Sequence, residues 1–158
     1  MKTYFAYGSN LNEVRFKTRV PSAKFGSCAT LRDHRLVFEK QSSDGSGKAT
    51  IIPDIRSVVE GAIFTYADED HENLKKCEGG YAESTVTVKT AAGDVRVLTF
   101  IAKYRDAKLK AFDWYVNHIV VGGAQLGLPK EYLDGIAKTP AEVDTDSARA
   151  AKERAYLT

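Results

Sequence analysis

The feature that most constrains this chain is its start, where a short strand-like run meets a polar turn without a linker. Residues 4–10 read YFAYGSN, and a helical pattern follows directly. A strand, a tight turn and a helix start together point several backbone N–H groups at one spot in space. Such a spot binds a carboxylate or a phosphate, because the N–H groups carry a partial positive charge.

The residues of this turn support two interpretations. Lys2–Tyr7 is rich in aromatic residues and is predicted to be a strand. A short helix is expected from Leu11 to about Thr18, with Asn10 as its cap and Glu13 completing a capping box. Glycine at position 8 would also let a ligand approach the backbone, since it has no Cβ. Local chemistry therefore leaves open whether the turn only caps the helix or also holds a ligand.

The remainder of the chain reads as strands interspersed with helices. Extended segments are expected over residues 29–38, 49–52, 58–66, 84–90 and 95–104, and helices over residues 68–77, 108–126 and 130–138. The last two extended segments should pair as a hairpin. This order favours one α+β domain with a strand-rich body over a regular βαβ repeat.

Finer features of this organisation are also predicted. The stretch from Gln41 to Lys48 is expected to be a polar loop. Pro53 is expected to end the short strand over residues 49–52. We place the domain at residues 1–139. Residues 140–158 form a polar tail with mixed charges, expected to be a helix that packs on the body or on a second subunit, which leaves a homodimer open.

Composition excludes several classes of function. The net charge is only +2, and the 23 basic residues are scattered among 21 acids, so no basic stripe suggests nucleic acid. No apolar run approaches the roughly 20 residues that cross a bilayer, and the start does not read as a signal peptide. Two cysteines make no disulfide framework and fit a reducing, cytoplasmic setting.

No metal or nucleotide site is predicted. His34, His71 and His118 lack the spacing of metal ligands, and the acidic run at residues 68–72 is interpreted as the first turn of a helix. The sequence GSGKAT resembles the end of a phosphate-binding loop, but the required earlier glycine and final Ser or Thr are missing. It is interpreted as a flexible loop.

Glu78 is a candidate acid/base. Leu74 lies four residues earlier, on the same helix face, so both side chains should point inward together. The helix C-terminus and an apolar pocket would both raise the pKa of Glu78 toward neutrality, as a general base requires. The alternative is a partly exposed residue beside a glycine stop. Cys77, next to it, is interpreted as a small buried thiol rather than a nucleophile.

Tyr115 is the third candidate. It shares a face of the long predicted helix with Phe112 and Ile119, at spacings of three and four residues. A buried tyrosine usually finds a partner for its hydroxyl. Core packing and a phenol that faces a ligand both remain open.

Taken together, these motifs resemble the gamma-glutamylcyclotransferase-like family. The resemblance begins with YFAYGSNL, includes Arg15 and Arg19 before PSA, and continues through RLVF, VEGAIF and CEGG. It ends with YVNHIVVGGAQLGLPKEYL, so it covers about residues 3–137 in order. The combination of YGSN, a Glu-Gly after a helix, and GLP is far more specific than any one of them.

The resemblance implies a small mixed β-barrel flanked by helices, with a ligand cavity at the YGSN turn. The implied reaction converts a gamma-glutamyl amide into 5-oxoproline and a free amine, without a cofactor or metal. The family's acid/base falls on Glu78 and a pocket tyrosine on Tyr115. Its ligand-holding loop falls on Tyr7, Gly8, Ser9, Asn10 and Leu11.

The resemblance does not name the amine that is released. Family members commonly carry an aromatic residue several positions after the acid/base, whereas this chain offers only Tyr81, three residues on. Gamma-glutamyl amino acids and gamma-glutamylamines both fit. A related lyase acting on a gamma-glutamylated metabolite would use the same residues. The alternative outside the enzymes is a small-molecule binding module. It would use the same cavity without turnover and would tolerate Gln at position 78.

Overall fold

A computed structural model describes all 158 residues of the chain. The strands are β1 (Lys2–Ala6), β2 (Lys24–Gln41), β3 (Gly47–Tyr66), β4 (Tyr81–Thr90), β5 (Gly93–Ala102), β6 (Ala111–Phe112) and β7 (Ala141–Glu142). The helices are α1 (Glu13–Arg19), α2 (His71–Cys77), α3 (Asp113–Leu126), α4 (Lys130–Ala137) and α5 (Ser147–Arg154). Short 3-10 helices cover Ser9–Leu11, Asp68–Asp70 and Ala155–Leu157.

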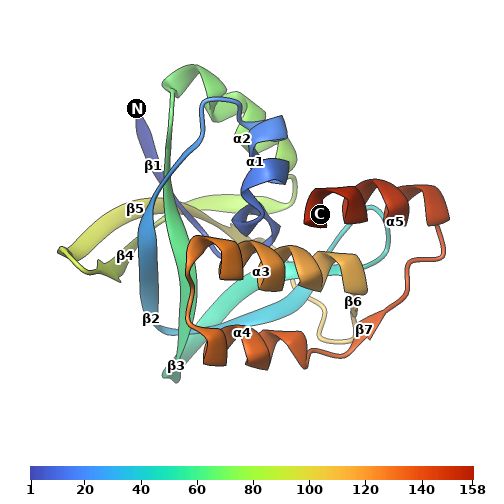
Figure 1. Cartoon of the computed structure of the whole chain (residues 1–158). Helices are drawn as coiled ribbons and strands as arrows, with labels where there is room; N and C mark the ends of the chain where they lie inside the picture. Colours follow the sequence, from blue (N-terminus) through green and yellow to red (C-terminus); the bar gives the residue numbers. More distant parts are fainter.

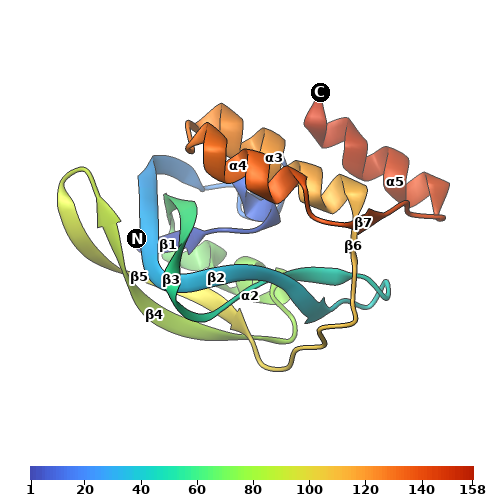
Figure 2. The same cartoon turned by 90° about the horizontal axis from the view of Figure 1, so that it is seen from below.

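Five strands close into a barrel in the order β1-β3-β2-β4-β5. β1 and β5 pair in parallel, and the other neighbours pair antiparallel, so the barrel is mixed. Helices α3 and α4 lie side by side against one flank, with α5 beside the start of α3 (Figures 1 and 2). The predicted fold class, a small mixed β-barrel flanked by helices in a single domain, is confirmed.

The predicted hairpin is confirmed, whereas the predicted strand end at Pro53 is wrong. β4 and β5 pair from Tyr81 opposite Ala102 to Thr90 opposite Gly93. β3 runs through Pro53, which lies opposite His34. Proline has no N–H to donate, so it is tolerated in strands at irregular positions. Such an irregularity is present, because the register shifts beside Asp33, a residue with a φ of 61°.

The helix starts differ from the sequence expectation in two places. Asn10 does not cap α1: the cap is Asn12, whose Oδ1 accepts from the Arg15 N–H at 3.2 Å. A 3-10 turn comes first, which moves the α-helix two residues along the chain. The long helix begins at Asp113 rather than Lys108, because residues 111–112 instead form strand β6, which pairs with β7 of the tail.

A close approach of α3 fixes the turn that follows β1. Gly122 of α3 lies against the backbone of this turn, and a Cβ there would come within 2.5 Å of the Leu11 carbonyl oxygen. In α1, which follows the turn, Phe16 packs edge-on against Phe64 of β3 at 5.1 Å between ring centroids, and both are fully buried. The turn is therefore fixed by its contact with α3 and by a following helix that is anchored in the core.

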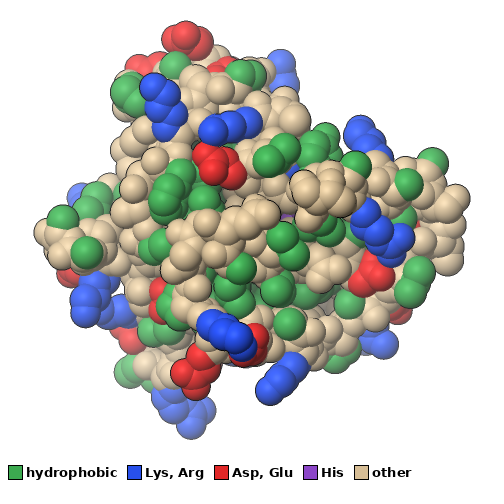
Figure 3. Space-filling model, viewed as in Figure 1, with side chains coloured by type: hydrophobic (Ala, Val, Ile, Leu, Met, Phe, Trp, Pro, Cys, Tyr) green, Lys and Arg blue, Asp and Glu red, His purple; other side chains and the backbone are tan.

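The molecular surface carries charges of both signs. Figure 3 shows basic and acidic side chains dispersed over the face that it presents, without a single-sign field. None of the helices has the length and apolar character needed to span a membrane.

Candidate functional site

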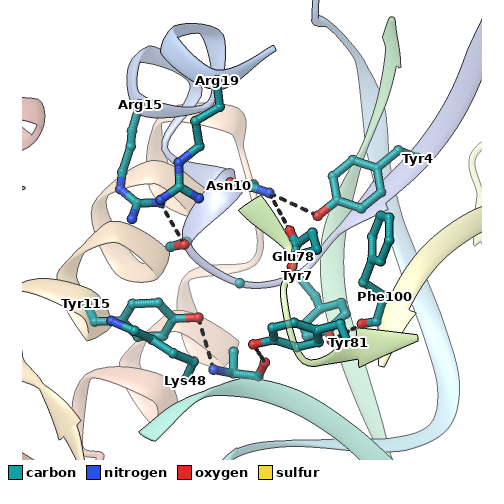
Figure 4. A pocket seen from close by; sticks show the side chains of 13 residues that line it. Tyr4, Tyr7, Asn10, Arg15, Arg19, Lys48, Glu78, Tyr81, Phe100 and Tyr115 are labelled. Carbon is teal, nitrogen blue, oxygen red and sulfur yellow. Dashed lines mark hydrogen bonds between the residues drawn. The ribbon is translucent and has the colours of Figure 1, made fainter. Parts of the chain in front are cut away.

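One cavity opens beside the turn at the end of β1, and it gathers most of the predicted site residues (Figure 4). Its lining includes Tyr7, Gly8, Ser9, Asn10, Glu78 and Tyr115. Leu11 lies outside the lining: its side chain is fully buried in the hydrophobic core. Residues far apart in the sequence thus meet at one place.

The turn presents backbone amides at this place. The first hydrogen bond of its 3-10 helix runs from the Leu11 N–H to the Gly8 carbonyl at 3.0 Å. The amides of Ser9 and Asn10 precede that bond and have no partner within the helix. Gly8 also permits close packing, since a Cβ there would lie 3.3 Å from the Tyr115 hydroxyl.

Glu78 reaches the cavity from the end of α2. It is the residue that follows the helix, with φ −106° and ψ 32°, and Leu74 on the same face is fully buried. The Asn10 Nδ2 donates to Glu78 Oε1 at 3.1 Å and to the Tyr4 hydroxyl at 3.2 Å. The turn and the carboxylate are thereby joined by one amide side chain.

The surroundings of Glu78 tune its charge. Burial among aromatic side chains raises the pKa of Glu78 to about 7, while Arg19 and the hydrogen bond from Asn10 act in the opposite direction. The residue keeps part of its surface exposed, because it borders the cavity. A carboxylate with this pKa exchanges protons near neutrality, which is what a general acid/base must do.

Three tyrosines shape the walls through contacts with the backbone. The Tyr115 hydroxyl accepts from the Ala49 N–H at 3.0 Å, and the Tyr81 hydroxyl donates to the Ala49 carbonyl at 2.7 Å. The Tyr7 hydroxyl donates to the Phe100 carbonyl. Tyr115 keeps its own O–H free to donate, because it acts as an acceptor toward Ala49.

The cavity is positively charged overall. Its lining holds Arg15, Arg19 and Lys48 against the single acid Glu78. The Arg15 Nη1 donates to the Ser9 hydroxyl at 2.9 Å, as Figure 4 shows. Such a balance favours a ligand that carries a carboxylate.

Lys48 is one of the three cations of the cavity lining, although the residues around it in the sequence predicted a loop. Its Nζ lies 3.2 Å from Asp44 Oδ2 and 4.5 Å from the centre of the Tyr115 ring. Burial lowers the pKa of Lys48 to about 8, although Asp44 acts to raise it. The predicted loop is shorter than expected: only the hairpin turn between Gln41 and Gly47 is irregular, and Lys48 already lies in β3.

Several lining residues were not predicted as site residues from the sequence. They are Tyr4, Arg15, Arg19, Lys48, Ala49, Tyr81 and Phe100. Arg15 and Arg19 lie one turn apart on the helix that follows the turn, and Tyr4 and Tyr81 lie three residues from Tyr7 and Glu78, so their spacing could have placed these four near the site. Lys48, Ala49 and Phe100 carry no local signal, since barrel closure brings them in. Cys77 was expected to be buried and is exposed, because α2 lays only Leu74 fully into the core.

Comparisons with known proteins converge on one family. A sequence profile of the AIG2-like family matches residues 58–136. The gamma-glutamylcyclotransferase of Bos taurus is 33% identical over 138 residues, which cover 82% of this chain and 73% of the bovine protein. The Homo sapiens enzyme of the same name is 31% identical over 142 residues, covering 83% and 74%. A solved gamma-glutamyl cyclotransferase structure superposes with a TM-score of 0.85 at 26% identity, over 96% of this chain and 98% of that one.

Proposed function

Because the chain belongs to the gamma-glutamylcyclotransferase family, we propose that it cyclises a gamma-glutamyl amide to 5-oxoproline and releases the free amine. One observation carries this proposal. The carboxyl group of Glu78, with a pKa of about 7, lies in the same cavity as the Gly8–Asn10 turn and accepts a hydrogen bond from Asn10. An acid/base and an anion-binding turn are what this cyclisation needs.

The charges of the substrate match those of the cavity. A gamma-glutamyl compound carries an α-carboxylate and an α-ammonium on one carbon. The turn amides and the nearby arginines suit the carboxylate or the oxyanion that develops during the reaction. Glu78 suits the ammonium, because its ionised form is the only negative charge in the lining.

The proposed reaction uses Glu78 twice. It first takes a proton from the α-ammonium, and the freed amine attacks the gamma-carbonyl of the same molecule. A C–N bond forms and closes the five-membered ring, while the carbonyl oxygen becomes an oxyanion. Glu78 then gives its proton to the leaving nitrogen, the oxyanion re-forms the carbonyl, and the original amide bond breaks. The ring nitrogen still carries one proton more than a lactam, and it loses this proton to the released amine, which leaves as an ammonium ion. Because the attack is intramolecular, holding the substrate in a folded conformation supplies much of the acceleration.

The Tyr115 hydroxyl has a defined place in this scheme. It lies close to Gly8, where a Cβ would be 3.3 Å away, and it keeps its proton free for donation. Together with the turn amides it would stabilise the oxyanion of the ring-closing step.

The test is release of 5-oxoproline from a panel of gamma-glutamyl amino acids and gamma-glutamylamines. Wild type would be compared with Glu78→Gln and with the matched control Glu72→Gln, an exposed residue of the same helix. We expect turnover in wild type and control, and its loss in folded Glu78→Gln. Binding without turnover in all three proteins would favour a small-molecule binding module instead.

A further inference from the structure

The tail helix α5 contacts one residue of the cavity lining, Arg15, through Glu153. Glu153 Oε2 lies 2.9 Å from Arg15 Nε, and the Arg15 side chain is only 6% exposed. The same oxygen is 2.9 Å from Nε2 of His118, a fully buried residue of α3. Glu153 thus connects the tail to two buried side chains, those of Arg15 and His118.

The network fixes the ring nitrogens of His118. The Asn12 Nδ2 lies 3.1 Å from His118 Nδ1 and donates to the Tyr156 carbonyl at 3.0 Å. An amide nitrogen can only donate, so Nδ1 accepts and Nε2 carries the proton that His118 donates to Glu153. Burial alone would raise the pKa of Glu153, but the hydrogen bond from His118 and the charge of Arg15 lower it to about 2. Glu153 is therefore ionised across the neutral range.

Arg15 is held on one side and free on the other. Its Nε contacts Glu153 and its Nη1 contacts the Ser9 hydroxyl. A guanidinium has five N–H donors, and these contacts use the Nε–H and one N–H of Nη1. The remaining donors are available on the side where Arg15 lines the cavity (Figure 4). Arg19 also lines the cavity, but it has no ion pair to fix its orientation.

We propose that Glu153 is a positioning residue that orients the Arg15 guanidinium, and that Arg15 receives the α-carboxylate of the gamma-glutamyl substrate. The C-terminal tail is then part of the binding site, although none of its residues lines the cavity. This inference rests on the proposed function for its substrate, but the orientation of Arg15 can be measured without turnover.

The experiment compares two neighbouring positions of α5. Glu153→Ala removes the contact with Arg15. The control Arg154→Ala breaks a different ion pair of the helix, in which Arg154 Nη2 lies 3.1 Å from Asp113 Oδ1, and leaves Arg15 untouched. Glu153→Gln keeps an oxygen acceptor in place without the charge, so it should fold even if Glu153→Ala does not.

Two readouts separate positioning from simple stabilisation. In wild type, NMR should show a slowly exchanging Arg15 Nε–H, and Glu153→Ala should lose it. KM should rise about tenfold in Glu153→Ala, with kcat changed by less than about twofold. The reason is that Arg15 would hold the α-carboxylate equally well in the ground state and in the transition state. Glu153→Gln should fall between wild type and Glu153→Ala, and Arg154→Ala should match wild type in both readouts.

The outcomes also separate this inference from the proposed function. An unchanged Arg15 Nε–H and unchanged KM in the Glu153 variants would overturn it, as would an equal rise of KM in Arg154→Ala. If wild type releases no 5-oxoproline, the proposed function fails. The positioning of Arg15 is then decided by its Nε–H signal and by binding of L-glutamate, whose affinity should fall about tenfold in Glu153→Ala.

Discussion

Replacing Glu78 by Gln should stabilise the fold at neutral pH while removing the proposed acid/base. Burial raises the pKa of Glu78 from 4.5 to about 7 in the folded protein. The folded state therefore binds the proton more tightly than the unfolded chain does. Between these two values the wild type loses stability as pH rises, because ionising the buried carboxyl is unfavourable. Gln stays neutral at every pH and does not incur this loss.

The size of the effect follows from the pKa shift. Each unit corresponds to 1.36 kcal/mol, so the full shift would make Glu78→Gln about 3 kcal/mol more stable than wild type above pH 7. Glu78 borders the cavity and keeps contact with water, which screens part of this cost. We therefore expect a gain of about 1.5–3 kcal/mol above pH 7, shrinking to less than about 1 kcal/mol at pH 5.

Urea unfolding of both proteins from pH 4.5 to 8.5 would measure this difference. The free energy of unfolding of Glu78→Gln, minus that of wild type, should rise through pH 5–7 and then level off. Glu72→Gln is the matched control and should show no such rise, because the hydrogen bond from Lys75 lowers the pKa of Glu72. A difference that stays flat with pH would refute the reasoning, since it would mean that folding does not desolvate Glu78.

Three further outcomes are expected. Asn10→Ala removes the hydrogen bond that lowers the pKa of Glu78, so the rise of kcat/KM with pH should move from a midpoint near 7 to higher pH; an unchanged midpoint would contradict it. Tyr115→Phe leaves a β3 backbone amide without its acceptor and should lower the free energy of unfolding in urea by about 1–2 kcal/mol. Gly122→Ala forces a Cβ against the backbone of the turn; it should cost about 1–3 kcal/mol and raise KM, and unchanged kinetics would show that the turn tolerates displacement.

Much of the site could be predicted because its elements are local. The first strand and its turn follow from the aromatic run and the glycine that ends it. The inward direction of Glu78 follows from its spacing to Leu74, since a buried residue four positions away fixes the face of the helix. The hairpin of β4 and β5 follows from strand patterns on either side of a short turn.

What could not be predicted depends on contacts across the fold. Asn10 and Asn12 are both good caps by composition, and packing of α3 against the turn decides that the α-helix starts after Asn12. Lys48 lies in a stretch rich in Gly and Ser, and only pairing with β2 makes it part of a strand. The tail pattern shows a charged helix but not that Glu153 meets Arg15, because the two are 138 residues apart.

The cations of the cavity serve the proposed reaction in two ways at once. Burial alone would keep Glu78 protonated and useless as a base at neutral pH, and Arg19 and Arg15 offset part of that effect. The same charges attract the α-carboxylate of the substrate. When that carboxylate binds, it neutralises them, and the pKa of Glu78 rises further. The α-ammonium arrives in the same step, and its positive charge beside Glu78 lowers that pKa again, so the carboxylate stays ionised until it takes the proton. Loss of Arg15 would therefore weaken binding and also alter the proton transfer that follows it.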